Sequence, residues 1–112
     1  MSLPRLPSAV FAFSDEVAFG ALRSLRRVGL EVPEDISLIG VDDHPMAESV
    51  DLTTIRQDPI EQGRAAARLC LDLLNGDSPL QQIRHETSLI PRRSTMPPHG
   101  RDPELRGRVT AP

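Results

Sequence analysis

The sequence predicts an α/β fold in which parallel strands alternate with helices. Two short apolar runs with the length of buried strands lie at residues 8–13 and 36–41. Between them, residues 15–28 carry apolar side chains at three- and four-residue spacing, which is typical of an amphipathic helix. A strand, a helix and a second strand with short connections imply a right-handed parallel crossover.

The ends of this first helix are marked by particular residues. Asp15 stands where an N-cap belongs, and Gly29 is the expected left-handed residue that stops the helix. The turn at residues 33–35 then leads into the second apolar run. A β-branched stretch from Leu52 to Gln57 predicts a third strand.

A second helix is predicted from Pro59 to about Asn75. Asp58 can cap it, Pro59 suits the first helical position, and Glu61 completes a capping box. The apolar stripe that this helix is expected to bury consists of Ala66, Ala67, Cys70, Leu71 and Leu74. Cys70 is therefore expected to have a core role.

The last third of the chain carries weaker signals. Residues 82–90 mix polar and apolar side chains and predict a possible strand. Residues 99–112 are rich in Pro, Gly and Arg without periodicity and predict a disordered tail, while residues 1–6 form a short leader.

Composition limits the class of protein. The 112 residues suffice for one small domain or a piece of a larger one. Aromatic residues make up only 3%, so the expected core is aliphatic, with rings from Phe11, Phe13 and Phe19. A net charge of −3 does not favour broad attraction to nucleic acid or anionic membranes. A single cysteine, no membrane-length apolar run and no secretory signal together predict a cytoplasmic location.

The candidate binding residues follow two strands. Ligands of open α/β sheets bind beyond the carboxyl ends of parallel strands. Ser14 and Asp15 follow the first strand, and Asp42, Asp43 and His44 follow the second. The Asp42 carboxylate can accept two hydrogen bonds from neighbouring hydroxyls of a sugar or nucleoside. Each of these residues also has a structural role as the alternative to ligand binding. Ser14 would bond to the backbone of its own turn, Asp15 would cap the helix, and Asp43 would be a solvated turn residue.

No catalytic or metal-binding constellation is recognisable. Ser14, Asp42 and His44 supply the residue types of a hydrolase triad, but Ser14 lacks the G-x-S-x-G elbow. Adjacent acids at a strand end point in different directions, and metal-ligand spacings such as HExxH are absent from the sequence. The dinucleotide motif G-x-G-x-x-G is missing, as is the lysine of a phospho-acceptor receiver domain. We therefore expect no enzyme, no metal and no cofactor.

Taken together, the motifs resemble those of lactose- and galactose-repressor-type (LacI/GalR-family) transcription regulators. The matching segments are PSAVFAFSDEVAFGALRSLRRVGLEVPEDISLIGVDD, LTTIRQD and LIPRRSTMPP, in the order and spacing of the family. The resemblance implies a periplasmic-binding-protein-like (type I) fold, a three-layer parallel-sheet sandwich in two lobes with effector in the cleft. Residues 7–98 would be the C-terminal portion of this domain, crossing between lobes at residues 57–58 and again near 88–91.

The resemblance also implies roles for individual residues. Ser14 falls where the family often has an effector-binding Asn, Asp42 on its sugar- or purine-hydroxyl-binding Asp, and Gln57 on a cleft-lining Gln. Asp15 falls on a near-fixed Asp that mainly caps the helix. Val41 replaces the usual aromatic residue and Ser14 replaces Asn, so the identity of the effector does not carry over.

Two further expectations concern partners. The family dimerises through helices of both lobes, which predicts a symmetric patch here with the members Val17, Phe19 and Ala21. The alternative for Phe19 is that its ring covers the sheet of its own chain. The expected function is a small-molecule-sensing and dimerisation module that reaches DNA only through an N-terminal helix-turn-helix domain missing from this chain. The alternatives are a sugar-binding component of a transport system, an enzyme, and a truncated product without independent activity.

Overall fold

A computed structural model describes residues 6–77 and 81–98. The chain divides into two compact units, of which the second is Gln57–Ser88 and the first holds the residues before and after it. The chain thus leaves the first unit after Arg56 and returns at Leu89, where the resemblance places the crossings. The predicted tail at 99–112 and most of the predicted leader lie outside the described residues.

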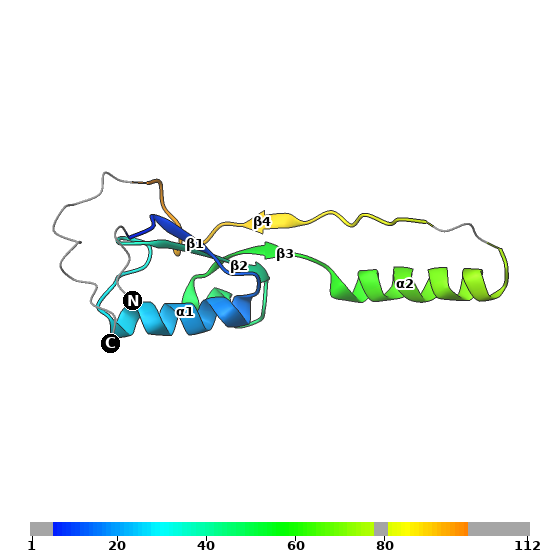
Figure 1. Ribbon diagram of the computed structural model, residues 1–112, viewed down its shortest axis with the longest axis horizontal. Helices are drawn as coiled ribbons and strands as arrows, with labels where there is room; N and C mark the ends of the chain where they lie inside the picture. Colours follow the sequence, from blue (N-terminus) through cyan, green and yellow to red (C-terminus); the bar gives the residue numbers. More distant parts are fainter. Residues whose placement is uncertain (1–5, 78–80, 99–112) are drawn as a thin grey trace. The chain divides into compact units, whose positions relative to one another are not determined.

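The first unit is built on a sheet with the strand order β1-β2-β3-β4. Its elements are β1 (Ala9–Phe11), α1 (Asp15–Arg27), β2 (Ser37–Asp42), the 3-10 turn η1 (Glu48–Val50), β3 (Thr53–Arg56) and β4 (Ser88–Ile90). β1 and β3 both pair with β2 in parallel, with Val10 opposite Leu38 and Val41 opposite Ile55. Figure 1 shows the β4 arrow running against β3. The predicted parallel strand–helix–strand arrangement is confirmed.

One face of the sheet is covered by α1. The helix buries Ala18 and Leu22 against Leu38 of β2, and Leu52 closes the same cluster. Burying a leucine side chain contributes about 1.5–3 kcal/mol, so these aliphatic contacts supply much of the stability of the unit. Gly29 lies just past the helix with a φ of 80°, as predicted for the residue that stops it.

The predicted contribution of phenylalanine rings to the core is wrong for two of the three. Phe11 is 62% exposed and Phe13 is 76% exposed, whereas Phe19 is half-buried. Side chains alternate across a strand, and Val10 packs on the α1 side, so Phe11 lies on the opposite face. The helix of the first unit, α1, packs on the other face, and the Phe11 ring stays in solvent.

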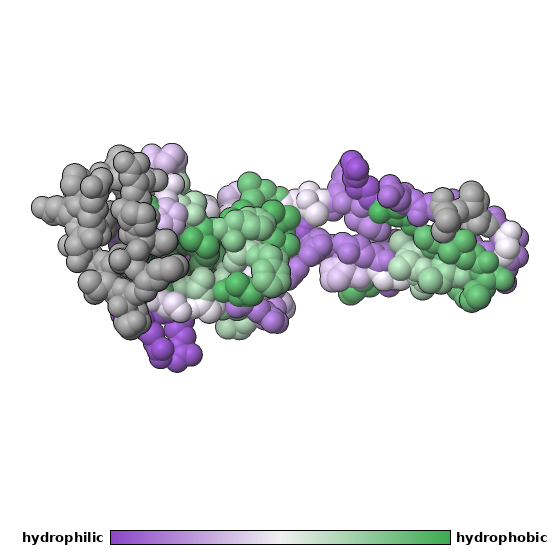
Figure 2. Space-filling view, viewed as in Figure 1, coloured by the Kyte–Doolittle hydropathy of each residue, from purple (hydrophilic) through white to green (hydrophobic). Residues whose placement is uncertain are grey.

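The second unit contains α2 (Pro59–Leu74). Its predicted cap is confirmed, because the Asp58 side chain accepts a hydrogen bond from the Glu61 amide at 2.9 Å. The helix ends at Leu74, with Asn75 as its C-cap. Figure 2 shows an apolar surface over this helix. Of the two helices in the described part of the chain, neither has the length and apolar character to cross a membrane.

The predicted burial of the α2 stripe is wrong. Ala66, Ala67 and Cys70 are exposed, and Leu71 and Leu74 are 60% and 82% exposed. An apolar helix face is buried only against another element, and residues 57–77 and 81–87 contain no second helix or strand. Residues 82–87 likewise have no strand in the described part of their own unit to pair with, so the strand predicted from residue 82 begins only at Ser88.

Candidate functional site

The predicted binding residues of the first unit lie at one edge of its sheet. The carboxyl ends of the parallel strands β1, β2 and β3 share this edge. Ser14 follows β1, and Asp42 is the last residue of β2, in register with Arg56 at the end of β3. Gln57 follows Arg56 and is the first residue of the second unit.

Ser14, and not Asp15, caps α1. Ser14 has an extended backbone, with φ −148° and ψ 158°, and its hydroxyl accepts a hydrogen bond from the Val17 amide at 3.2 Å. An N-cap residue needs such a non-helical backbone, whereas Asp15 is already the first helical residue. The prediction that Asp15 is a cap is therefore wrong.

The Asp15 carboxylate points into the protein. Asp15 is 0% exposed, and its two oxygens accept hydrogen bonds from the Thr54 hydroxyl at 2.6 Å and the His44 amide at 2.7 Å. A buried carboxylate is stable only when it is hydrogen-bonded, and its place in the first helical turn adds the favourable field of the helix N-terminus. Asp15 therefore ties α1 to the loop after β2.

The backbone at the end of β2 is held in a strained conformation. Asp42 has a φ of 118° and Asp43 a φ of 53°, values that residues other than glycine adopt at a cost of about 1–3 kcal/mol each. The Asp43 amide donates to the Thr54 hydroxyl at 3.2 Å. Thr54 thus joins Asp43 to Asp15, and the neighbouring Asp42 is exposed at the edge of the sheet.

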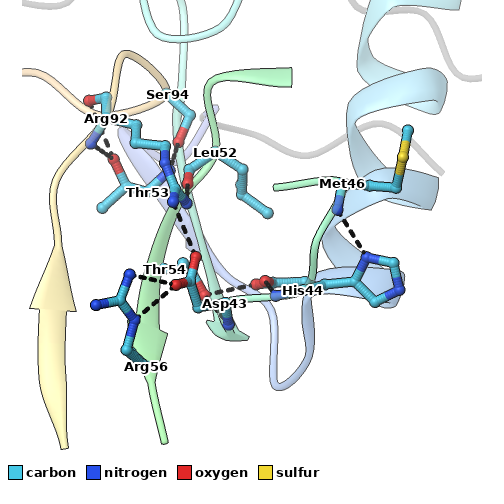
Figure 3. A network of polar contacts seen from close by, with 10 residues as sticks. Asp43, His44, Met46, Leu52, Thr53, Thr54, Arg56, Arg92 and Ser94 are labelled. Carbon is cyan, nitrogen blue, oxygen red and sulfur yellow. Dashed lines mark hydrogen bonds and ion pairs between the residues drawn. The ribbon is translucent and has the colours of Figure 1, made fainter. Parts of the chain in front are cut away.

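Asp43 is the centre of an ion-pair network (Figure 3). Its Oδ2 accepts from Arg56 Nε and Nη2, both at 2.7 Å, and its Oδ1 accepts from Arg92 Nη2 at 2.9 Å. The side chains of Asp43 and Arg92 are only 13% and 15% exposed, whereas Arg56 is 57% exposed. The hydrogen bond from Arg92 lowers the pKa of the Asp43 carboxyl, against the opposing effect of burial. The alternative that Asp43 is a solvated turn residue is wrong.

Arg92 and Ser94 attach the segment after β4 to the sheet. Arg92 Nη1 donates to the Leu52 carbonyl at 2.9 Å, and the Arg92 amide donates to the Thr53 hydroxyl at 2.9 Å. The Ser94 hydroxyl accepts from the Thr53 amide at 2.8 Å and donates to the Leu38 carbonyl. Sequence reasoning missed these contacts and the role of Thr54, although Arg56 lay near the end of one predicted strand and Arg92 followed another.

The other chemistries considered from the sequence find no support in this arrangement. The Ser14 hydroxyl is engaged by the Val17 amide, and His44 Nδ1 accepts from the Met46 amide at 3.0 Å. In a triad the serine hydroxyl bonds to histidine Nε2, and histidine Nδ1 donates to the aspartate, whereas Nδ1 of His44 accepts a bond from the Met46 amide. Within residues 6–77 and 81–98, no group of three or more potential metal ligands comes together.

The predicted dimer residues differ in their surroundings. Val17 is 44% exposed, while Ala21 and Phe19 are half-buried and pack against the core. The Phe19 ring contacts the His44 ring edge-on, with centroids 5.5 Å apart. Phe19 also lines a surface groove of about 550 Å³, together with Leu22, Arg23, Arg26, Arg27, Met46 and Val50.

Known proteins are similar to this chain in sequence and in fold. The profile of the periplasmic binding protein-like domain matches residues 1–95. The HTH-type transcriptional repressor CytR of Escherichia coli (strain K12) is 47% identical over 78 residues, which are 68% of this chain and 23% of that protein. The chain therefore spans about a quarter of the length of this relative.

Two solved structures of regulators superpose on the chain. The lac repressor dimer bound to operator and the anti-inducer ONPF has a TM-score of 0.75 at 32% identity, covering 82% of this chain and 33% of that one. A LacI family transcriptional regulator from Enterococcus faecium with bound ribose has a TM-score of 0.74 at 36% identity, covering 86% and 37%. The relatives are transcription regulators rather than enzymes. The chain belongs to the periplasmic binding protein-like domain family, and within it to the LacI-type regulators.

Proposed function

We propose that this chain is the part of a LacI-type regulator that binds a small-molecule effector, a sugar or nucleoside, and joins two subunits. The observation that carries the proposal is the position of Asp42, an exposed acidic residue at the carboxyl edge of a parallel sheet. Polyhydroxylated ligands bind at such edges, and the Enterococcus faecium relative was solved with ribose. Ser14 and Gln57 are proposed as further contacts.

The proposal assigns DNA contact to a separate helix-turn-helix domain, as the name of the CytR repressor indicates for that protein. The effector would act by changing the relative stability of two states of the regulator, because a ligand shifts an equilibrium only when it binds the two states unequally. Such a regulator would act on DNA in the cytoplasm.

Thermal melts with D-ribose, other pentoses, hexoses and nucleosides test effector binding. A ligand at about 100 times its dissociation constant should stabilise the protein by about 2.7 kcal/mol. The same series on a version extended by the upstream sequence of the gene would supply contacts from the rest of the cleft. No shift in either protein with any compound would refute the effector proposal.

A matched pair of variants assigns the binding to Asp42. Asp42→Asn should abolish the ligand-induced shift, because the amide keeps the shape but loses the charge that strengthens hydrogen bonds to hydroxyls. Asp51→Asn is the control, since Asp51 is also an exposed acid with positive φ (54°) but precedes β3 at the opposite end of the strand. An equal loss in both variants would contradict the assignment.

The dimer proposal places Val17, Phe19 and Ala21 at a symmetric contact. The solved lac repressor dimer supports it, because this chain superposes on that protein. Phe19→Glu should shift the protein to monomer in sedimentation measurements. Since Phe19 also packs on the core, Met46→Glu is the second variant: Met46 is 52% exposed and lines the same groove. An unchanged oligomeric state in both variants would refute the proposal.

A further inference from the structure

We propose that Asp43 is the positioning residue of the effector site, and that its carboxylate fixes the strand end that presents Asp42 by holding one arginine at each connection to the second unit. The inference rests on the proposed function for what Asp42 binds. The geometry of the carboxylate and its arginines is independent of that function.

Both oxygens of the Asp43 carboxylate are hydrogen-bonded to arginines of the first unit. Oδ2 accepts both bonds from Arg56, and Oδ1 accepts the bond from Arg92. With an exposed side-chain fraction of only 13%, Asp43 is badly placed to accept bonds from a ligand as well. Asp43 therefore acts through its neighbours, whereas Asp42 is the exposed acid at this edge.

Both arginines stand beside a connection between the units. Arg56 is the last residue before the chain leaves the first unit, and Arg92 follows soon after the return at Leu89. Arg92 also binds the Leu52 carbonyl, which fixes its guanidinium against the start of β3. One carboxylate at the end of β2 thus holds the outgoing and the returning segment at the same point.

The backbone explains why such a hold is needed at this position. Asp42 and Asp43 are successive non-glycine residues with φ values of 118° and 53°. Strained backbones of this kind persist only where the surrounding contacts determine them. The Asp43 amide is bonded to Thr54 and the His44 amide to Asp15, so the arginine pairs on the Asp43 side chain complete the set of contacts that orient Asp42.

Amide hydrogen exchange in the full chain tests the positioning role without any ligand. Asp43→Asn keeps the side-chain shape and tolerates positive φ, but removes the charge that holds both arginines. We expect exchange of the amides of residues 43 and 44 to rise at least about tenfold more than that of the Ala18 and Leu22 amides in α1, whose rise reports the loss of global stability. A uniform increase at all four positions, or none, would overturn the proposal, because a merely stabilising ion pair acts through global unfolding.

Conservative rescue and ligand affinity complete the test. Asp43→Glu retains the charge but tolerates the positive φ less well, so it should restore only part of the protection, whereas Asp51→Asn should leave it unchanged. If wild type responds to D-ribose or another compound of the panel, Asp43→Asn should weaken that affinity at least about tenfold; faster local exchange with unchanged affinity would overturn the link to the site. If wild type responds to none of them, the proposed function fails, and the exchange rates alone decide whether Asp43 positions the strand end.

Discussion

Gly40 is the position where the smallest change should have the largest effect. It lies in the middle of β2, opposite Thr54 of β3. A methyl group there would overlap Asp15 Oδ1 and come within 3.2 Å of Asp15 Cα and of Leu52 Cδ2. The added methyl group of Gly40→Ala would therefore clash with the buried Asp15 carboxylate, which packs against this position of the sheet.

The expected loss follows from what must move. The overlapping atom, Asp15 Oδ1, accepts the hydrogen bond from the Thr54 hydroxyl, and a bond to a charged group contributes about 1.5–3 kcal/mol. Overpacking a closed site costs about 1–3 kcal/mol, whereas alanine recovers about 0.5–1 kcal/mol of backbone entropy in a strand. Gly40→Ala should therefore lower the free energy of unfolding by about 1.5–5.5 kcal/mol.

Urea unfolding measures this loss, and Gly20→Ala is the matched control. Gly20 lies in α1 with no atom within 4 Å of the position that a Cβ would take, so alanine should stabilise the helix by about 0.5–1 kcal/mol. The two variants add the same methyl group, and we expect opposite changes in the free energy of unfolding. A Gly40→Ala protein within about 0.5 kcal/mol of wild type would refute the conclusion that the Asp15 carboxylate is held rigidly.

Three further predictions concern the network and the second helix. Thr54→Val removes the hydroxyl that donates to Asp15 and accepts from the Asp43 amide, and should lower the free energy of unfolding by about 2–3 kcal/mol, while Thr54→Ser should restore part of it. The pKa of Asp43 is lowered by Arg92, so its ion pairs stabilise the fold above the unfolded pKa of about 3.9 and lose this effect as the pH falls through the folded value. The difference in free energy of unfolding between wild type and Asp43→Asn should be constant between about pH 5 and 7 and shrink below about pH 4. A difference that stays the same at all pH values would contradict a stabilising role of the ion pairs. Asp58→Ala removes the cap of α2 and should reduce helix stability by about 1 kcal/mol, seen as lost helical circular dichroism that Asp58→Asn retains.

The sequence was sufficient for the elements that depend on local signals. Apolar run length placed β2, and the cap at Asp58 placed the start of α2. The first helix was placed well, but its cap was assigned one residue late, since Ser14 and Asp15 are both good cap residues. Only the backbone conformation at Ser14 distinguishes them.

Burial was predicted less well because it depends on partners distant in sequence. The stripe around Cys70 and Leu71 has the correct helical spacing, yet it is exposed because no described element of its unit packs on it. The predicted burial of the Phe11 ring is wrong for the same reason, because the ring lies on the face of the sheet opposite α1. Amphipathic spacing therefore identifies the face that a helix or strand can bury, but not whether a partner is present.

The three acids at the site show why their roles could not be separated from the sequence. Asp15, Asp42 and Asp43 all follow apolar strands, and local signals give each of them the choice of cap, turn or ligand. The third strand and the segment after β4 decide between these roles, because Thr54 and Arg92 supply the donors that occupy Asp15 and Asp43. A carboxylate buried with its hydrogen bonds complete is held in place, and two such neighbours hold the strained turn that leaves Asp42 at the surface. Asp15 and Asp43 thus have structural roles that depend on residues distant in sequence, which no local pattern around the three acids could reveal.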